Sequence, residues 1–143
     1  MLKGISPIIS PPLMNALMEM GHGDELVFGD SNFPSVTRAS RTIYCCGHGI
    51  TEFLKAIFPL FPLDYAVEYC GILMNPTELD PVRPPVWEDY RNLFHGEEHG
   101  QKEFLYLEKQ EFYSRAERAF AVVATSEASP FSNLIIRKGI VLP

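Results

Sequence analysis

His22, in the run Gly21-His22-Gly23, is the residue of this chain best suited to transfer protons. Glycine has no side chain, so a ligand can approach the backbone closely on both sides of the imidazole. An imidazole changes its charge near neutral pH, and His22 is therefore a candidate general acid or base. The same residues also fit the end of a helix that stops at a glycine and continues into a polar loop. The run alone leaves both interpretations open.

Asp30 is the second candidate, because it directly follows the apolar run Leu26-Val27-Phe28-Gly29. Such a run is typical of a buried strand. Open α/β sheets bind ligands at the carboxyl ends of their strands, so a strand here would bring the carboxylate of Asp30 to a ligand-binding edge.

A third candidate region lies in the last third of the chain, where Tyr113 and the segment 131–133 flank an expected strand. The phenol of Tyr113 and the amide of Asn133 can exchange hydrogen bonds with sugar hydroxyl groups. The ring of Phe131 or Trp87 can cover the apolar face of a sugar. Core packing for Tyr113 and a turn role for Asn133 are the alternatives.

Two further patterns resemble metal sites but lack support from their surroundings. The run from His95 to His99 matches H-x-x-E-H, a zinc pattern that needs both histidines on one helix face, yet two glycines weaken a helix there. Cys45 and Cys46, with His48 nearby, have no second ligand pair at zinc-site spacing. The chain also lacks the glycine-rich nucleotide-binding motifs and the G-x-S-x-G motif. These patterns therefore give no support to a metal site, a nucleotide cofactor or a serine nucleophile.

Apolar periodicity and turn residues predict an alternation of helices and strands that would position these residues. Helices are expected from Ser10 to Met20, from Thr51 to the prolines at 59 and 62, from Pro85 onward and from Glu111 to Ala119. Strands are expected at 25–28, 42–45, 65–74, 104–107, 120–125 and 134–137. Such alternation favours an α/β fold, a sheet covered by helices, and residues 1–143 are expected to form one domain.

Composition limits the classes of function. The chain has 143 residues, 46% of them hydrophobic, which suffices for one core that buries roughly two-thirds of the unfolded surface. The formal net charge of −6, without a dense Lys/Arg cluster, argues against nucleic acid or a membrane surface as the main partner. The most apolar stretch, 56–63, is interrupted by prolines and is too short to span a bilayer. No signal core and an odd number of cysteines lead us to expect a soluble, cytoplasmic protein.

Many short runs also occur in the order found in a known family. They are Leu2-Lys3-Gly4-Ile5, Met20-Gly21-His22-Gly23-Asp24-Glu25, Asp30 with Asn32-Phe33-Pro34, Pro62-Leu63-Asp64, Pro85-Val86-Trp87, Phe112-Tyr113, Ala119 to Thr125, and Asn133 with Arg137-Lys138-Gly139. Together they resemble the L-fucose mutarotase branch of the family that also contains D-ribose pyranase. The resemblance runs nearly end to end. It implies the family's α/β fold, ring-shaped homo-oligomers (decamers or an octamer) and interconversion of sugar anomers without a metal or an organic cofactor.

The resemblance also implies roles for individual residues. His22 matches the family's proton-donor histidine, and Asp30 matches its substrate-binding aspartate. Asp64, Tyr113 and Asn133 match further substrate-binding positions.

Three positions depart from the family's pattern. Lys109 and Phe131 stand at substrate-binding positions where fucose-type members carry arginine and tyrosine. Tyr44-Cys45-Cys46-Gly47 stands where Arg-Ala-Asp-Gly is usual. Loss of a phenol at position 131 removes a hydrogen-bonding group, so we expect weaker selectivity for L-fucose.

The resemblance therefore predicts a mutarotase. Opening a cyclic hemiacetal requires removal of a proton from the anomeric hydroxyl and delivery of one to the ring oxygen. His22 would transfer a proton, Asp30, Asp64 and Asn133 would hold hydroxyl groups, and Tyr113 would bind or assist. A non-catalytic monosaccharide-binding protein and a structural ring protein with a vestigial pocket are the alternatives.

Overall fold

The computed structural model describes residues 2–143, in which six strands form one mixed sheet. The strands are β1 (Glu25–Gly29), β2 (Thr42–Cys45), β3 (Gly71–Met74), β4 (Leu105–Leu107), β5 (Ala121–Thr125) and β6 (Leu134–Arg137). They lie in the order β2-β5-β1-β6-β3-β4. β6 is antiparallel to both of its neighbours, and all other neighbouring strands are parallel. Five strands thus end at one edge of the sheet, the carboxyl edge, and β6 ends at the opposite edge, the amino edge.

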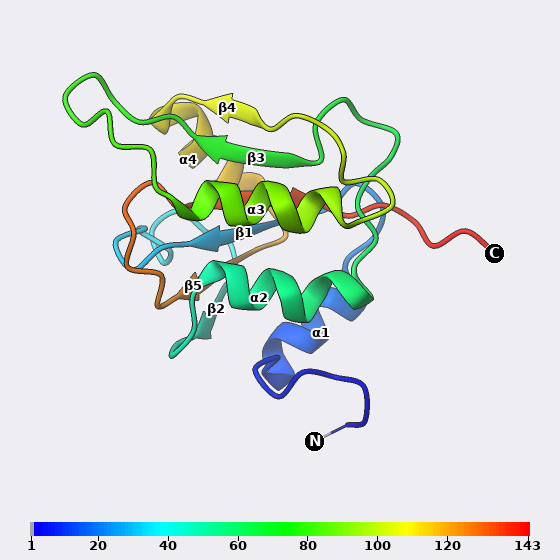
Figure 1. Ribbon diagram of the computed structural model, residues 1–143. Coiled ribbons are helices and arrows are strands. Elements are labelled where there is room, and N and C mark those ends of the chain that lie inside the picture. The colour runs from blue at the N-terminus through cyan, green and yellow to red at the C-terminus, as the bar shows by residue number, and fades with distance from the viewer. Residues whose placement is uncertain (1) are drawn as a thin grey trace.

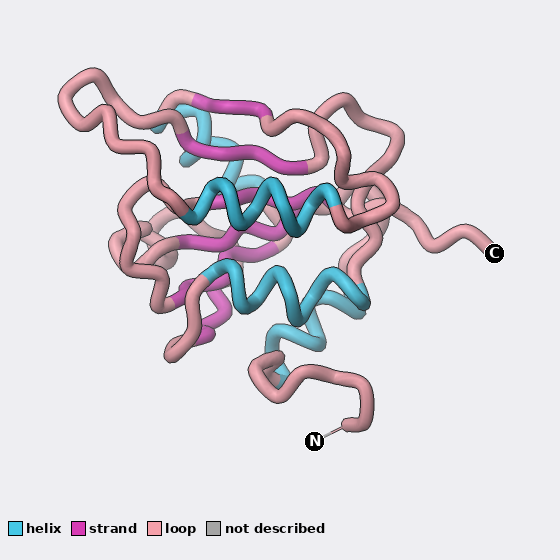
Figure 2. The backbone as a smooth tube through the Cα atoms, viewed as in Figure 1, coloured by secondary structure: helices cyan, strands magenta, loops and turns pink. Residues whose placement is uncertain are grey.

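Helices cover both faces of the sheet, as the sequence predicts (Figure 1). α1 (Pro11–Glu19), α2 (Ile50–Ile57) and α3 (Val86–His95) pack on one face, and α4 (Lys109–Arg118) packs on the other. A short 3-10 helix, η1 (Phe58–Leu60), continues α2. Figure 2 shows that the connecting loops gather at the two edges, where a binding site can form.

Strand β1 shows how the sequence produces these layers. Leu26 and Phe28 belong to the core beneath α1, α2 and α3, whereas Val27 belongs to the core beneath α4, together with Phe112 and Ala116. All five side chains are buried. Successive strand residues point to opposite faces, so a strand covered on both faces is a continuous apolar run. The apolar run before Asp30 therefore places that aspartate at the carboxyl edge.

Most of the predicted elements are confirmed, with helices α2 and α4 beginning one or two residues earlier than expected. The strand predicted at 65–74 is wrong over most of its length, because β3 covers only Gly71–Met74. The preceding loop wraps around the ammonium group of Lys102, which donates hydrogen bonds to the carbonyl oxygens of Asp64, Tyr65 and Val67. Carbonyl oxygens that a strand would offer to its neighbour are bound by a side chain instead.

The H-x-x-E-H run does not form one helix face. α3 ends at His95 and Gly96 follows as its C-cap, whereas the ring of His99 lies beside Tyr65. None of the helices formed by residues 2–143 has the length and apolar character needed to cross a membrane.

Candidate active site

The seven residues selected from the sequence lie in two groups at opposite edges of the sheet. His22 and Asp64 are at the amino edge, before β1 and β3. The other five, at or close to the carboxyl edge, are Asp30, Lys109, Tyr113, Phe131 and Asn133. β1 has five residues, and at about 3.3 Å per residue it holds its ends roughly 15 Å apart. One monosaccharide bound to one chain therefore cannot contact both groups.

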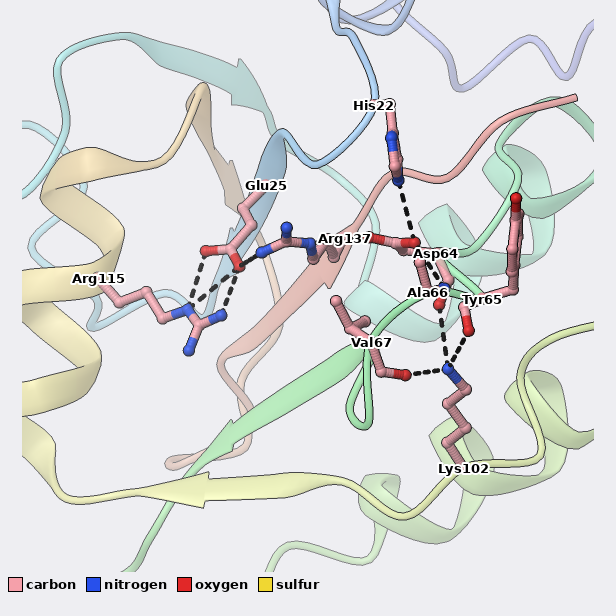
Figure 3. A network of polar contacts seen from close by, with 9 residues as sticks. All are labelled: His22, Glu25, Asp64, Tyr65, Ala66, Val67, Lys102, Arg115 and Arg137. Carbon is pink, nitrogen blue, oxygen red and sulfur yellow. Dashed lines mark hydrogen bonds and ion pairs between the residues drawn. The ribbon is translucent and has the colours of Figure 1, made fainter.

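At the amino edge, His22 pairs with a buried carboxylate (Figure 3). Its Nε2 lies 3.2 Å from Oδ1 of Asp64. The imidazole is 49% exposed, whereas the carboxylate side chain is 1% exposed. Solvent therefore reaches the imidazole of His22 but does not reach the Asp64 carboxylate that contacts it.

Asp64 receives hydrogen bonds on both of its oxygens. Oδ1 also accepts from the Ala66 amide at 3.0 Å, and Oδ2 accepts from Nε of Arg137 at 2.9 Å. Burial alone would raise the pKa of Asp64, but the hydrogen bonds from Ala66, Arg137 and His22 together hold this pKa below its usual value. The carboxylate therefore stays ionised beside the imidazole at neutral pH.

Arg137 continues the contacts away from Asp64. Its Nη1 lies 3.7 Å from Oε1 of Glu25. Arg115 on α4 donates to both oxygens of Glu25, at 2.6 Å from Nη2 and at 3.0 Å from Nε. Figure 3 shows the four charged side chains in a row that leads to His22.

At the carboxyl edge, a hydrogen bond joins the backbone amide of Asp30 to the side chain of Asn133. The Asp30 amide donates to Oδ1 of Asn133 at 2.8 Å, and Oδ1 of Asp30 accepts from the Asn32 amide at 2.9 Å. Both side chains are largely buried. Burial raises the pKa of Asp30 above its usual value, although hydrogen bonds, including one from Asn32, oppose this shift. The arrangement provides a carboxylate of raised proton affinity beside an amide.

The segment 131–133 is held in place by α3. The Trp87 indole donates to the carbonyl of Phe131 at 3.0 Å, and the Tyr90 phenol donates to the carbonyl of Ser132 at 2.9 Å. Phe131 has a φ of 59°, a left-handed conformation that is uncommon outside glycine. Two aromatic donors thus fix the backbone that carries Phe131 and Asn133.

Tyr113 lies between cationic and aromatic groups. The Phe33 ring meets its ring edge-on with centroids 5.6 Å apart. The guanidinium carbon of Arg38 is 5.0 Å from the centre of the ring, and Nζ of Lys109 is 5.6 Å from it. Tyr113 therefore packs at the end of α4 that faces the carboxyl edge, with two cations near its phenol ring.

A depression of about 370 Å³ is lined by Asp30, with Phe33 and Thr125 among its other walls. This volume is within the range of small-molecule sites. A larger depression of about 820 Å³ beside α1 is lined mainly by apolar residues and contains no titratable side chain. The larger hollow therefore offers no side chain that could transfer a proton, whereas the smaller one borders Asp30.

Sequence reasoning gave no role to Glu25, Arg115 or Arg137. These residues are separated by up to 112 positions along the chain and do not recur at a regular spacing. No local sequence pattern could therefore have linked them. The cysteines are free, with Cys45 buried against Ser10 and Cys46 exposed. Across residues 2–143, no three His, Cys, Asp or Glu side chains are grouped so that they could hold a metal ion.

The model of the RbsD / FucU transport protein family matches residues 3–141. The chain belongs to this family. A solved fucose mutarotase from Streptococcus pneumoniae, in complex with L-fucose, is 41% identical, with a TM-score of 0.91 over 99% of this chain and 100% of that one. FucU from Bifidobacterium longum is 40% identical, with a TM-score of 0.93 over 98% of this chain and all of its own.

A more distant member supports the fold alone. RbsD from Bacillus subtilis, complexed with D-ribose, is 21% identical and superposes with a TM-score of 0.75 over 99% of this chain and 100% of its own. The resemblance recognised in the sequence and the fold that it implied are thus both confirmed.

Proposed function

We propose that this protein is a mutarotase that interconverts the α and β anomers of a monosaccharide, with L-fucose as the first substrate to test. The observation that carries the proposal is the half-exposed His22 imidazole beside the buried Asp64 carboxylate. This pair occurs in a chain that is 41% identical over almost its whole length to a fucose mutarotase.

The residues at the two edges fit the two requirements of the reaction. Ring opening and reclosure need proton transfer, which an exposed imidazole performs near neutral pH without a redox step. Sugar hydroxyls need donors and acceptors held in fixed positions, which Asp30, Asn133 and Lys109 provide at the carboxyl edge. Tyr113 and Phe131 add aromatic surface for the apolar face of the sugar.

A complete site requires the two edges to come from different chains. Because roughly 15 Å of strand separates His22 from Asp30 within one chain, a sugar that contacts both must lie between neighbouring subunits. A closed ring repeats one such interface at every subunit, which supports the homo-oligomer expected from the family resemblance.

The proposal is tested by saturation-transfer NMR of L-fucose, in which exchange between the two anomer signals is measured with and without protein. The unsubstituted chain should accelerate exchange. His22→Gln keeps polar bulk but cannot accept and release a proton near neutrality, so exchange should fall by about 10² or more.

His48→Gln provides a matched control. His48 is also partly exposed and also paired with a carboxylate, Glu52, but it follows β2 at the carboxyl edge, away from His22, and its imidazole contacts Glu52 and Phe53 rather than a candidate residue. Its substitution should leave exchange unchanged. Ligand-induced shifts with anomers exchanging at the uncatalysed rate would instead indicate a non-catalytic sugar-binding protein, and unchanged exchange in His22→Gln would remove this histidine from the mechanism.

A further inference from the structure

At the carboxyl edge, the sheet presents a tyrosine beside two small residues on the face that α4 covers. Ile43 and Cys45 belong to the core beneath α1, α2 and α3, so Tyr44 between them points to the α4 face. In the strand register, Tyr44 is paired with Ala124, and Ala124 is paired with Gly29. Residues paired in register share a face of the sheet. The small side chains at positions 29 and 124 therefore leave one side of the Tyr44 ring uncovered.

The depression of about 370 Å³ beside Asp30 lies at the Tyr44 end of this row. Tyr44 and Ala124 line it from the sheet, and Phe33 and Val36 line it from the loop that follows β1. Tyr44 is 66% exposed and Val36 is 65% exposed. Both side chains thus offer apolar surface to a molecule bound in the depression.

The polar character of the depression is concentrated at Asp30. This residue is 5% exposed, and it alone carries a charge among the described residues that line the depression. The serine and threonine hydroxyl groups of the lining already donate to backbone carbonyl oxygens: Ser31 to Glu127, Ser35 to Phe33, Thr37 to Pro34 and Thr125 to Gly29. A ligand in the depression therefore meets a carboxyl group on one side and mainly carbon atoms on the other.

We propose that Tyr44 is a specificity-determining residue, whose ring, together with Val36, covers the carbon-bound hydrogens of a sugar held by Asp30 and favours a methyl over a hydroxymethyl substituent. The inference deepens the proposed mutarotase function and rests on it. The substrate class is a 6-deoxyhexose such as L-fucose, from which L-galactose differs only by a hydroxyl group on carbon 6. A hydroxyl group placed against this surface loses its hydrogen bonds to water and finds few replacements.

The fold does not depend on the Tyr44 side chain. β2 is the edge strand of the sheet (Figure 1), and Tyr44 belongs to neither of the two cores. Arginine is usual at this position in the resemblance to fucose-type members, so the aromatic surface distinguishes this chain from that pattern. Substitutions at Tyr44 should therefore change ligand preference without unfolding the protein.

The first measurement is equilibrium binding of L-fucose and L-galactose to the protein labelled with 13C in its tyrosine rings. The Tyr44 signal is assigned by its loss in Tyr44→Phe. This signal should shift on addition of L-fucose, and the dissociation constant should be about tenfold lower for L-fucose than for L-galactose. A Tyr44 signal that stays in place at saturating L-fucose would overturn the inference. The measurement does not require the protein to accelerate anomer exchange.

The second measurement is the ratio of kcat/KM for L-fucose to kcat/KM for L-galactose, from saturation-transfer NMR. Tyr44→Ala should lower this ratio by about tenfold through a higher KM for L-fucose with little change in kcat, because the ring contacts the sugar equally before and during ring opening. Val36→Ala should lower the ratio by less. Tyr44→Phe keeps the ring and should keep the ratio.

Leu79→Ala is the matched control, because Leu79 is 99% exposed in the loop that follows β3 and does not line the depression. Its ratio should equal that of the parent. An unchanged ratio in Tyr44→Ala would overturn the inference, and so would a changed oligomeric state in light scattering, which would assign the ring to a contact between subunits. Absence of exchange in the parent would instead contradict the proposed function, while the binding measurement would still decide the role of Tyr44.

Discussion

At the scale of single residues, two buried aspartates show how the balance between burial and hydrogen bonds sets the pKa of a carboxyl group. The pKa of Asp64 is lowered by donors that outweigh its burial, and the pKa of Asp30 is raised because burial outweighs its donors. Ionised Asp64 thus adds to stability above its unfolded pKa, and this contribution is lost as pH falls through the depressed value. Burial instead disfavours ionised Asp30, so protonated Asp30 contributes stability that is fully present below its unfolded pKa and is lost as pH rises through the raised value.

Phe131 is the residue at which we expect sugar preference to be set. A phenylalanine can stack on a sugar but cannot exchange a hydrogen bond with it, and a net neutral hydrogen bond contributes about 0.5 to 1.5 kcal/mol. Phe131→Tyr should therefore raise the ratio of L-fucose to D-ribose exchange rates by a few-fold. Saturation-transfer NMR with both sugars at matched pH measures this ratio.

Phe120→Tyr adds the same hydroxyl at a partly buried ring that packs against Arg41, far from the carboxyl edge. This control should not alter the ratio. A ratio that stays constant or falls in Phe131→Tyr would show that position 131 does not set the preference, and the segment from Tyr44 to Cys46 would be the next candidate.

At the scale of secondary-structure elements, β6 links the two groups of candidate residues. Asn133 directly precedes the strand at the carboxyl edge, and Arg137 ends it at the amino edge. Its antiparallel direction between β1 and β3 places Arg137 beside Glu25 and close to Asp64. A shift of β6 along its neighbours would disturb both edges together.

Gly71 lies on β3 and pairs with β6. A substitution at Gly71 therefore tests how tightly this part of the sheet is packed. A methyl group there would lie 2.5 Å from the Phe104 ring and 2.8 Å from the Phe94 ring, closer than carbon atoms can pack. We expect Gly71→Ala to lower the free energy of unfolding by about 1 to 3 kcal/mol, because overpacking displaces well-packed rings. Urea unfolding followed by circular dichroism measures the change.

Gly21→Ala is the corresponding control, since its nearest neighbour would be 3.7 Å away. It should unfold at nearly the same urea concentration as the parent. Equal urea midpoints for Gly71→Ala and the parent would contradict this expectation, because they would mean that the rings of Phe94 and Phe104 move aside without a loss of stability.

At the scale of the whole molecule, the proposed function requires assembly, because the candidate residues are divided between two edges of the sheet. His22→Gln damages one edge and Asp30→Asn the other, so neither homo-oligomer should catalyse exchange. Co-expression of the two chains should restore roughly a quarter of the parent activity, because random mixing pairs two intact edges at that fraction of interfaces in a closed ring. Light scattering should report a closed homo-oligomer.

A mixture of His22→Gln with His22→Ala serves as the control, because both chains are damaged at the same edge and no intact site can form. Restored exchange confined to the first mixture supports a shared site. A monomer that catalyses exchange would contradict the assembly.

The sequence by itself determined the family and most of the elements, although not the extent of β3. Periodicity and capping residues act between neighbours, so Ser10 before α1 and the apolar run before Asp30 could be interpreted without the fold. The end-to-end order of the family's motifs identified the chain's relatives and selected the seven candidate residues.

Only the tertiary structure decided which of those residues meet. His22 and Asp64 are 42 positions apart, Asp64 and Arg137 are 73 apart, and Glu25 and Arg115 are 90 apart. Local spacing carries no information on such pairs, because they are set by strand order and by the antiparallel direction of β6. The length of β1 separates His22 from Asp30, and for that physical reason the proposed function assigns one chain two half-sites rather than one complete site.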